Sequence, residues 1–322
     1  MHRTVDGLGE DGASRADLKL LSRSLRELRH AFRFFDGLRD RPKVTVFGSA
    51  RLSPDSPACR QAESFGREMA RAGWFVVTGA GDGIMAAAHR GAGREHSIGV
   101  NILLPFEQLE NTVMEGNPRL IHTKYFFTRK LLFLKESSGI VLFPGGFGTM
   151  DEAFEALTLL QTGKTHPFPV VLVDVPGGNY WATWRRFLEE DLWKAEMISE
   201  DDFSLFRITS SVEEAVREIL GFYRVFHSAR YVGPEMVIRL REPLPPDAPA
   251  VLGDEFPDLL EDGGFTLGAA LPGEADEPEI AGLIRLRFRF NGRNHGMLRR
   301  LIDRINGYAS IPSRNLVVPR HL

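Results

Sequence analysis

The sequence predicts a doubly wound α/β fold, a Rossmann-like parallel sheet with helices on both faces. Two patterns between residues 43 and 226 predict it. Short apolar runs bounded by glycine alternate with segments whose apolar residues recur every three or four positions. The short runs are apolar throughout, which is typical of strands buried on both faces of a parallel sheet. Glycine-rich turns at the ends of two of these runs are also expected in this class of fold.

The individual elements follow from the same patterns. Segments rich in Val, Ile and Phe are expected to be strands, at residues 43–50, 74–81, 96–105, 120–126, 139–145, 168–174 and 203–210. Segments with helical spacing of apolar residues are expected to be helices, at residues 59–73, 83–93, 127–137, 149–163, 181–197 and 211–226. Five of the six expected helices connect two of these strands, as a parallel sheet requires, and the sixth follows the last strand.

The N-terminal region precedes this alternation. Residues 1–14 are polar and contain glycine, so a disordered tail is expected there. Residues 16–38 carry one apolar stripe at spacings of three and four, made of Leu18, Leu21, Leu25, Leu28, Phe32 and Phe35. This stripe predicts a helix packed on the flank of the domain, with a dimerisation helix as the alternative.

The alternation stops near residue 230, where a proline-rich segment follows. Beyond it, residues 236–241, 265–271 and 283–290 are expected to be strands, and residues 248–261 and 295–309 helices. Their order, β-α-β-β-α, predicts a small α+β appendix. We therefore expect a tail at 1–14, a Rossmann-like domain at 15–230 and a regulatory or interaction domain at 231–322.

Composition limits the classes of partner. The net charge is −3, from 40 basic and 43 acidic residues, too balanced for charge alone to indicate nucleic acid or a membrane surface. No apolar run is long enough to span a membrane, and the N-terminus does not resemble a signal peptide. Cys59 is the single cysteine, so no disulfide forms within the chain. These observations favour a cytoplasmic protein with neither a membrane nor a nucleic acid as its partner.

Two glycine-rich segments, VTGAGDGIM and LFPGGFGTMDE, each connect an expected strand to a helix. Glycine lets the backbone approach a ligand closely, and the N-terminus of the following helix offers unpaired N–H groups. Together they predict a phosphate site made of Gly145, Gly146, Gly148 and Thr149. The alternative, in which the glycines only permit tight turns, is less consistent with such a run appearing twice.

The common phosphate-binding motifs are absent. Gly79, Gly81 and Gly83 have the wrong spacing for a dinucleotide fingerprint. The triplet at 163–165, Gly-Lys-Thr, lacks the first glycine of a P-loop, because Thr158 takes its place, and it follows a helix. No motif typical of zinc or calcium sites is present. The sequence thus predicts neither a cofactor nor a metal ion.

The segment PGGFGTMDE, which ends at Glu152, resembles the P-G-G-x-G-T-x-x-E signature of the LOG ("lonely guy") family. VFGSAR, VTGAGDGIMAAAHRGA and YFFTRK are similar to the other motifs of that family, in the same order, and the resemblance extends over residues 43–222 of a long form with a C-terminal extension. It implies hydrolysis of the N-glycosidic bond of nucleoside 5′-monophosphates, AMP-like purine or cytokinin nucleotides, to free base and ribose 5-phosphate. It also implies a homodimer or higher homo-oligomer.

The resemblance assigns roles to individual residues. Arg129 and Glu152 are expected to be catalytic, although composition alone would favour a surface ion pair for Arg129. The expected substrate-binding residues are Ser49, Gly79, Gly81, Gly83, Met85, Lys130, Pro144, Gly145, Gly146, Gly148, Thr149 and Glu155. A solvated surface charge is an equal alternative for Glu155. The alternative function is a non-catalytic nucleotide sensor or carrier, but such a protein needs neither Arg129 nor Glu152.

Overall fold

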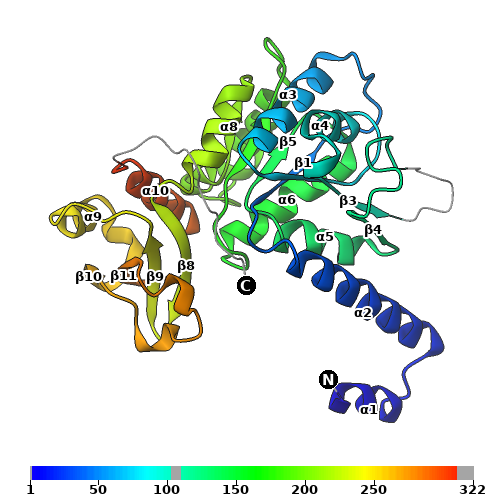
Figure 1. Cartoon of the computed structure of the whole chain (residues 1–322). Coiled ribbons are helices and arrows are strands. Elements are labelled where there is room, and N and C mark those ends of the chain that lie inside the picture. The colour runs from blue at the N-terminus through cyan, green and yellow to red at the C-terminus, as the bar shows by residue number, and fades with distance from the viewer. Residues whose placement is uncertain (1, 103–109, 310–322) are drawn as a thin grey trace.

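A computed structural model describes residues 2–102 and 110–309. Its main feature is a seven-stranded parallel sheet with the strand order β4-β3-β2-β1-β5-β6-β7 (Figure 1). The strands are β1 (Lys43–Phe47), β2 (Phe75–Thr78), β3 (Ser97–Ile102), β4 (Leu120–Thr123), β5 (Ile140–Leu142), β6 (Val170–Val173) and β7 (Arg207–Thr209). The predicted doubly wound α/β class is confirmed. The order reverses between β1 and β5, the place where such folds bind ligands.

Helices cover both faces of the sheet. The helices of the chain are α1 (His2–Glu10), α2 (Arg15–Asp36), α3 (Pro57–Arg71), α4 (Ile84–Ala92), α5 (Phe126–Lys135), α6 (Phe147–Gln161), α7 (Tyr180–Phe187), α8 (Val212–Gly221), α9 (Ala248–Glu255) and α10 (His295–Asn306). Helices α3, α4 and α8 pack into one core cluster, and α2, α5, α6 and α7 into another. Val44 and Val46 of β1 face the first cluster and Phe47 the second, as the alternation of side chains along a strand requires.

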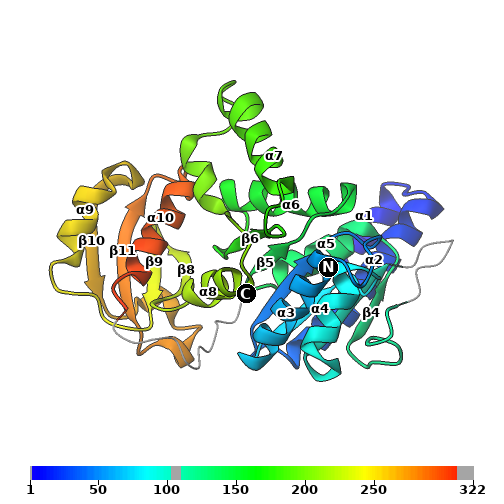
Figure 2. The ribbon, with the colours of Figure 1, turned by 90° about the horizontal axis from the view of Figure 1, so that it is seen from above.

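A second sheet, antiparallel with the order β10-β11-β9-β8, lies beside the first (Figure 2). Its strands are β8 (Phe226–Val232), β9 (Glu235–Leu240), β10 (Leu260–Gly268) and β11 (Ile284–Phe290). The expected α+β appendix therefore has the order β-β-α-β-β-α, with one strand more than predicted. The additional strand, β8, begins at Phe226, which is the last residue of the helix expected at 211–226. Since β8 pairs with β9 and crosses residue 230, the second sheet begins before the expected boundary.

The apolar stripe on α2 is not its buried face. Leu18, Leu21, Leu25 and Phe32 are exposed, whereas Glu27 is among the few buried residues of this helix. Spacing alone predicted the helix correctly, and Leu28 and Phe35 of the stripe pack against the domain, as expected for a helix on its flank. The rest of the stripe stays outside, and the inward face includes Glu27, whose carboxylate is satisfied by hydrogen bonds. Figure 1 shows α2 extending away from the sheet.

Two further segments differ from the expectation. Residues 2–10, expected to be disordered, form α1, which buries no residue. Its end is closed by local hydrogen bonds such as Asp11 N–H to Gly7 O at 2.8 Å, so the helix needs no tertiary contact. The helix expected at 181–197 ends its α-helical part at Phe187 and continues as a π-helical turn, Leu188–Trp193. None of the helices in the described residues is long and apolar enough to span a bilayer.

Candidate functional site

Three loops meet at the carboxyl ends of neighbouring strands, beside the point where the strand order reverses. They follow β1, β2 and β5. Ser49 N–H, after β1, donates to Pro144 O, after β5, at 3.1 Å. Ser49 O accepts from Ile84 N–H, which follows the glycine loop of β2, at 3.0 Å. The backbone of Ser49 thus connects both glycine-rich loops into one surface.

Two glycines in these loops have no room for a side chain. At Gly83, whose φ is +61°, a Cβ atom would lie 2.3 Å from Ser49 O. At Gly145, a Cβ atom would lie 2.0 Å from Thr149 Oγ1. Both distances are far below a van der Waals contact, so glycine is required for the loops to meet.

Gly146 and Gly148 show the opposite situation, because open space surrounds the position of a Cβ at each. Gly146 is the N-cap of α6, and no side chain caps this helix. The N–H groups of its first turn are therefore available, next to the positive end of the helix dipole. Thr149, in the same turn, is buried. This arrangement can bind an anion through backbone N–H groups.

Arg129 reaches this surface from α5. Its Nη2 atom lies 2.2 Å from the position that a Cβ on Gly79 would occupy, and Met85 Sδ lies 2.9 Å from the same position. The guanidinium therefore lies over the backbone of the second glycine loop. Its Nε atom is buried without a hydrogen-bond partner. Burial lowers the pKa of Arg129, while the neighbouring Glu152 carboxylate raises it.

Glu152 lies on α6, one turn after Thr149, and is 8% exposed. Burial raises the pKa of Glu152 to about 7, although Lys130 and Arg129 act in the opposite direction. Its Oε2 atom is buried without a hydrogen-bond partner. A buried carboxylate and a buried guanidinium, each with an unused polar atom, are more typical of a functional site than of a structural ion pair.

Comparisons with known proteins agree with these motifs. A family model described as "Possible lysine decarboxylase" matches residues 82–219. A probable cytokinin riboside 5′-monophosphate phosphoribohydrolase from Oryza sativa subsp. japonica is 32% identical over 46% of this chain and 59% of its own length. The cytokinin riboside 5′-monophosphate phosphoribohydrolase of Mycobacterium tuberculosis is 32% identical over 37% of this chain and 63% of its own length. The domain built on the parallel sheet is similar to this family, and we call it the LOG domain for that reason.

The match to these relatives is partial, because this chain spans less than two thirds of either relative's length. Solved structures similar to this chain include a molybdenum cofactor binding protein from Rippkaea orientalis, 20% identical over 55% of this chain and 94% of its own, with a TM-score of 0.39. A molybdenum cofactor carrier protein from Chlamydomonas reinhardtii is 23% identical over 56% and 99%, with a TM-score of 0.38. With TM-scores below 0.5, these two structures do not bear on the function of this chain.

One residue with a side chain has a left-handed conformation in the second glycine loop of this LOG domain. Ala80 has a φ of +59°, which costs a residue with a Cβ atom about 1 kcal/mol. Asn111 holds this loop, since its N–H donates to Ala80 O at 2.8 Å and its Nδ2 to Gly81 O at 3.1 Å. The buried His89 ring in turn contacts Asn111 Nδ2 at 3.2 Å. His89 is therefore structural, and nothing in the sequence indicated Asn111.

Two expected substrate-binding residues of the LOG domain are engaged with each other. Lys130 Nζ lies 2.8 Å from Asp151 Oδ2 and 2.5 Å from Glu155 Oε2. Its positive charge is thus balanced locally, and within the described residues neither Lys130 nor Glu155 forms a hydrogen bond or ion pair with the glycine loops. Ser49 Oγ similarly accepts from Arg51 N–H at 3.1 Å, the local turn contact of a small polar residue.

Tyr180, at the start of α7, is a contact of the LOG site that sequence reasoning missed. Its hydroxyl donates to Gly145 O at 2.5 Å. The hydrogen bond fixes the orientation of a peptide in the loop before α6. No local pattern distinguishes this tyrosine from one in a core, because the loop that it holds lies 35 residues earlier in the chain.

Proposed function

We propose that this chain hydrolyses the N-glycosidic bond of nucleoside 5′-monophosphates and releases the free base and ribose 5-phosphate. One observation carries the proposal. Arg129 and Glu152 are buried close enough to influence each other's pKa, each has an unpartnered polar atom, and both lie beside the glycine loops. The names of the curated relatives support the same class of reaction.

The 5′-phosphate binds the N–H groups at the start of α6, at Gly146, Gly148 and Thr149. Gly145 and Pro144 shape the turn that exposes them, and Ser49, Gly81 and Gly83 line the adjacent loops. Binding energy from the phosphate, which is remote from the reacting carbon, holds the ribose in place for the reaction. The open space at Gly146 and Gly148 supports this assignment.

Glu152 acts on the sugar. Glycosidic cleavage passes through a positively charged, oxocarbenium-like ribose, which an ionised carboxylate stabilises. The C–N bond breaks with its electron pair moving to the base, and a water molecule then adds to the sugar carbon and loses a proton. Arg129 is always protonated, so it stabilises negative charge on the phosphate or the departing base and transfers no proton. Lys130 and Glu155 support the positions of α5 and α6 through their ion pair.

We propose AMP-like purine or cytokinin nucleotides as substrates. Met85 Sδ, beside Gly79 and Arg129, offers a polarisable apolar contact for a base. The names of the rice and mycobacterial relatives also refer to cytokinin nucleotides. A decarboxylase dependent on a lysine Schiff base is less consistent with the site, because the nearby Lys130 is paired with two carboxylates.

The test is incubation of the full chain with AMP, CMP, GMP and isopentenyladenosine 5′-monophosphate, followed by chromatography for free base. We expect base from at least one purine nucleotide, and a loss of about 100-fold or more in Glu152→Gln. Glu68→Gln, at a half-buried position of α3 where the carboxylate pairs with Arg71, is the control and should keep the wild-type rate. Nucleotide binding without any release of base would favour the alternative, a non-catalytic sensor or carrier.

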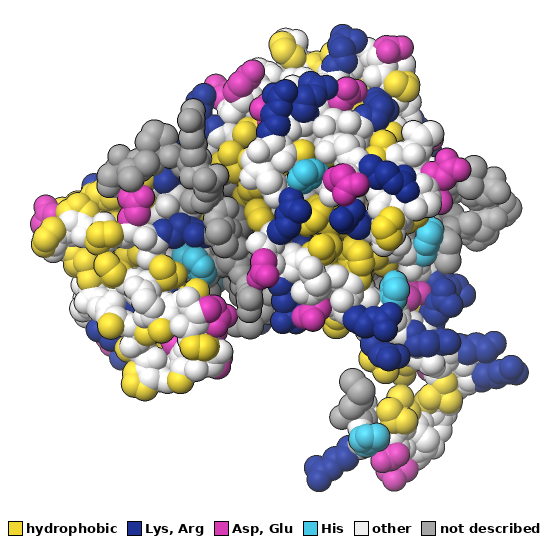
Figure 3. Space-filling view, in the orientation of Figure 1, with side chains coloured by type: hydrophobic (Ala, Val, Ile, Leu, Met, Phe, Trp, Pro, Cys, Tyr) yellow, Lys and Arg dark blue, Asp and Glu magenta, His cyan; other side chains and the backbone are white. Residues whose placement is uncertain are grey.

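We also propose a homodimer or higher homo-oligomer in which exposed apolar side chains of the LOG domain meet. Leu21 and Leu25 of α2, Leu131 of α5 and Phe147 of α6 are all exposed, Phe147 by 97%. Exposed apolar residues gathered on one domain are typical of an interaction surface. In Figure 3, Lys and Arg side chains lie along the part of the molecule where Figure 1 places α2, so this helix is amphipathic. Light scattering coupled to gel filtration, with Leu21→Glu as the variant, tests the proposal, and a monomeric wild type would exclude it.

A further inference from the structure

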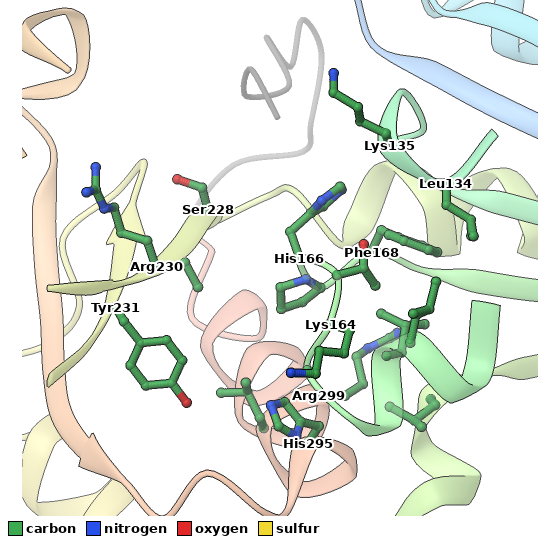
Figure 4. A pocket seen from close by; sticks show the side chains of 18 of the residues that line it. Leu134, Lys135, Lys164, His166, Phe168, Ser228, Arg230, Tyr231, His295 and Arg299 are labelled. Carbon is green, nitrogen blue, oxygen red and sulfur yellow. The ribbon is translucent and has the colours of Figure 1, made fainter. Parts of the chain in front are cut away.

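A cavity of about 810 Å³ lies between the LOG domain and the second sheet (Figure 4). Its walls come from α5, α6 and the loop after α6 on one side, and from β8, β9 and α10 on the other. Neither Arg129 nor Glu152 lines it, and no residue of the glycine loops does. The cavity therefore lies apart from the glycine loops, Arg129 and Glu152, although the Lys130–Glu155 ion pair forms part of its wall. Its volume is in the range of small-molecule binding sites.

Apolar side chains form much of the cavity wall. Leu134 of α5, Leu160 of α6, Phe168 before β6, Met236 of β9 and Leu298 of α10 all line it, and each is buried. A ligand that places hydrocarbon or an aromatic ring against these residues removes its own apolar surface from water. This is favourable at roughly 25 cal/mol per Å².

The Gly163-Lys164-Thr165 turn, which is not a P-loop, also lines the cavity. Gly163 has a φ of +64°, and a Cβ atom there would lie 2.1 Å from His295 Nε2. The absence of a side chain thus allows the His295 ring of α10 to lie directly on the turn. Figure 4 shows the Lys164 side chain extending toward His295. No ion pair of Lys164 is found within residues 2–102 and 110–309.

Arg299 and His295, one turn apart on α10, have unused polar atoms at the same place. Arg299 is 4% exposed, and its Nε and Nη2 atoms bind Asp303 and Glu218, with the Nε–Oδ1 distance at 3.0 Å. Its Nη1 atom is buried without a partner, as is His295 Nδ1. Such atoms in a folded protein generally require an explanation, and a bound ligand is one.

The charged side chains of the cavity wall indicate which ligand charge the cavity can balance. Two carboxylates, Glu218 and Asp303, already offset the charge of Arg299. Arg230 and Arg239, also on the wall, pair with Glu277, and Lys135 pairs with Glu136. Lys164 supplies the one positive charge on the wall for which no carboxylate partner is found among the described residues. A ligand with one negative charge therefore balances the charge of Lys164, whereas a dianion would leave one negative charge unbalanced.

We propose that this cavity binds an organic monoanion with an extended apolar body, such as a medium-chain carboxylate. The carboxylate lies between Lys164 Nζ and Arg299 Nη1, beside His295, and the apolar body lies along Leu134, Phe168 and Leu298. A charge-assisted hydrogen bond to each cation fixes the head group, and burial of the hydrocarbon provides affinity. Because α5 and α6 form part of the wall, the ligand contacts the two helices that carry Arg129 and Glu152.

Isothermal titration of the full chain with decanoate tests this proposal. We expect saturable binding of one decanoate per chain, and weaker binding of the uncharged decan-1-ol. Lys164→Gln should weaken the binding of decanoate about fivefold or more, since it removes the unpaired charge. Gly163→Ala should weaken it as well by displacing His295. Lys194→Gln, at an exposed lysine outside the cavity, is the matched control and should leave the affinity unchanged.

Three outcomes would overturn the proposal: no saturable binding of decanoate, decanoate binding that Lys164→Gln leaves unchanged, or equal affinity for decanoate and decan-1-ol. Circular dichroism of each variant separates a lost site from a lost fold. The titration involves no nucleotide and no turnover, so its result is independent of the proposed hydrolase activity.

Discussion

Glu27 of α2 accepts a hydrogen bond from Thr128 Oγ1 in the first turn of α5 at 3.0 Å. The other oxygen of this carboxylate accepts from Lys124 N–H, just before the helix, at 3.1 Å. Tyr125, the N-cap of α5, provides no side-chain cap, and Glu27 binds this end of the helix from α2 through the N–H that precedes the N-cap and the Thr128 hydroxyl. A carboxylate also interacts favourably with the positive end of the helix dipole. The N-terminal helix of the chain thus stabilises the start of the helix that carries Arg129.

Glu27→Gln should therefore lower the free energy of unfolding by about 1–2 kcal/mol, because the capping charge is lost from a buried position. Urea denaturation measures this change. Arg23→Gln is the matched control. It removes only the partly exposed ion pair between Arg23 and the same carboxylate, for which we expect less than about 0.5 kcal/mol. Equal losses in the two variants would show that the cap is not the important contact.

Gly79→Ala should separate the position of Arg129 from the stability of the fold. The new Cβ atom would lie 2.2 Å from Arg129 Nη2, the end of a flexible side chain that can move away. We expect a small change in Tm and a loss of nucleotide hydrolysis of about tenfold or more, since the guanidinium leaves its place over the loop. Rates of base release and thermal denaturation provide the two readouts. A wild-type rate in Gly79→Ala would contradict the role given to Arg129.

The raised pKa of Glu152 predicts a pH dependence of stability. The folded state holds the proton up to about pH 7, whereas the unfolded chain releases it near 4.5. Stability from this group is therefore fully present below pH 4.5 and is lost as the pH rises through 7, by up to about 3 kcal/mol. Glu152→Gln does not titrate, so its stability relative to wild type should increase over the same interval.

Urea denaturation of both proteins at about pH 5 and about pH 8 measures the difference. If Glu152→Gln and wild type differ by the same amount at both pH values, then the carboxylate is not desolvated as the structure indicates. Hydrolysis should depend on pH in the opposite sense and increase through pH 7, because the ionised carboxylate stabilises the oxocarbenium-like sugar.

The sequence could predict the parallel sheet and the glycine loops because both depend on local patterns. Strands such as Lys43–Phe47 and Ile140–Leu142 are rich in apolar residues and are buried on both faces, and the glycines of the loop before α6 follow directly in the chain. The outward direction of Leu18 and Leu25 could not be predicted in the same way. Which face of a helix is buried depends on its neighbours, and here the buried Glu27 is satisfied by partners about a hundred positions away.

The contacts that orient the site were similarly beyond local reasoning. Asn111 holds one glycine loop through two hydrogen bonds to backbone oxygens, and Tyr180 holds the other through one, each from a distant part of the chain. The pairing of Lys130 with Asp151 and Glu155 depends on how α5 packs on α6. Composition and spacing identify which residue types are present, but the partner of each polar group is set by tertiary structure.

Tyr180→Phe tests whether this distant contact matters for the phosphate site. The variant removes one hydroxyl and leaves Gly145 O without its tyrosine donor, with almost no change in volume. We expect the free energy of unfolding to fall by about 1 kcal/mol. We also expect KM for the nucleotide to rise several-fold with kcat nearly unchanged, because the loop binds the phosphate in the ground state and in the transition state alike. A fall in kcat at constant KM would show instead that Tyr180 acts on the reacting sugar and not on the loop that binds the phosphate.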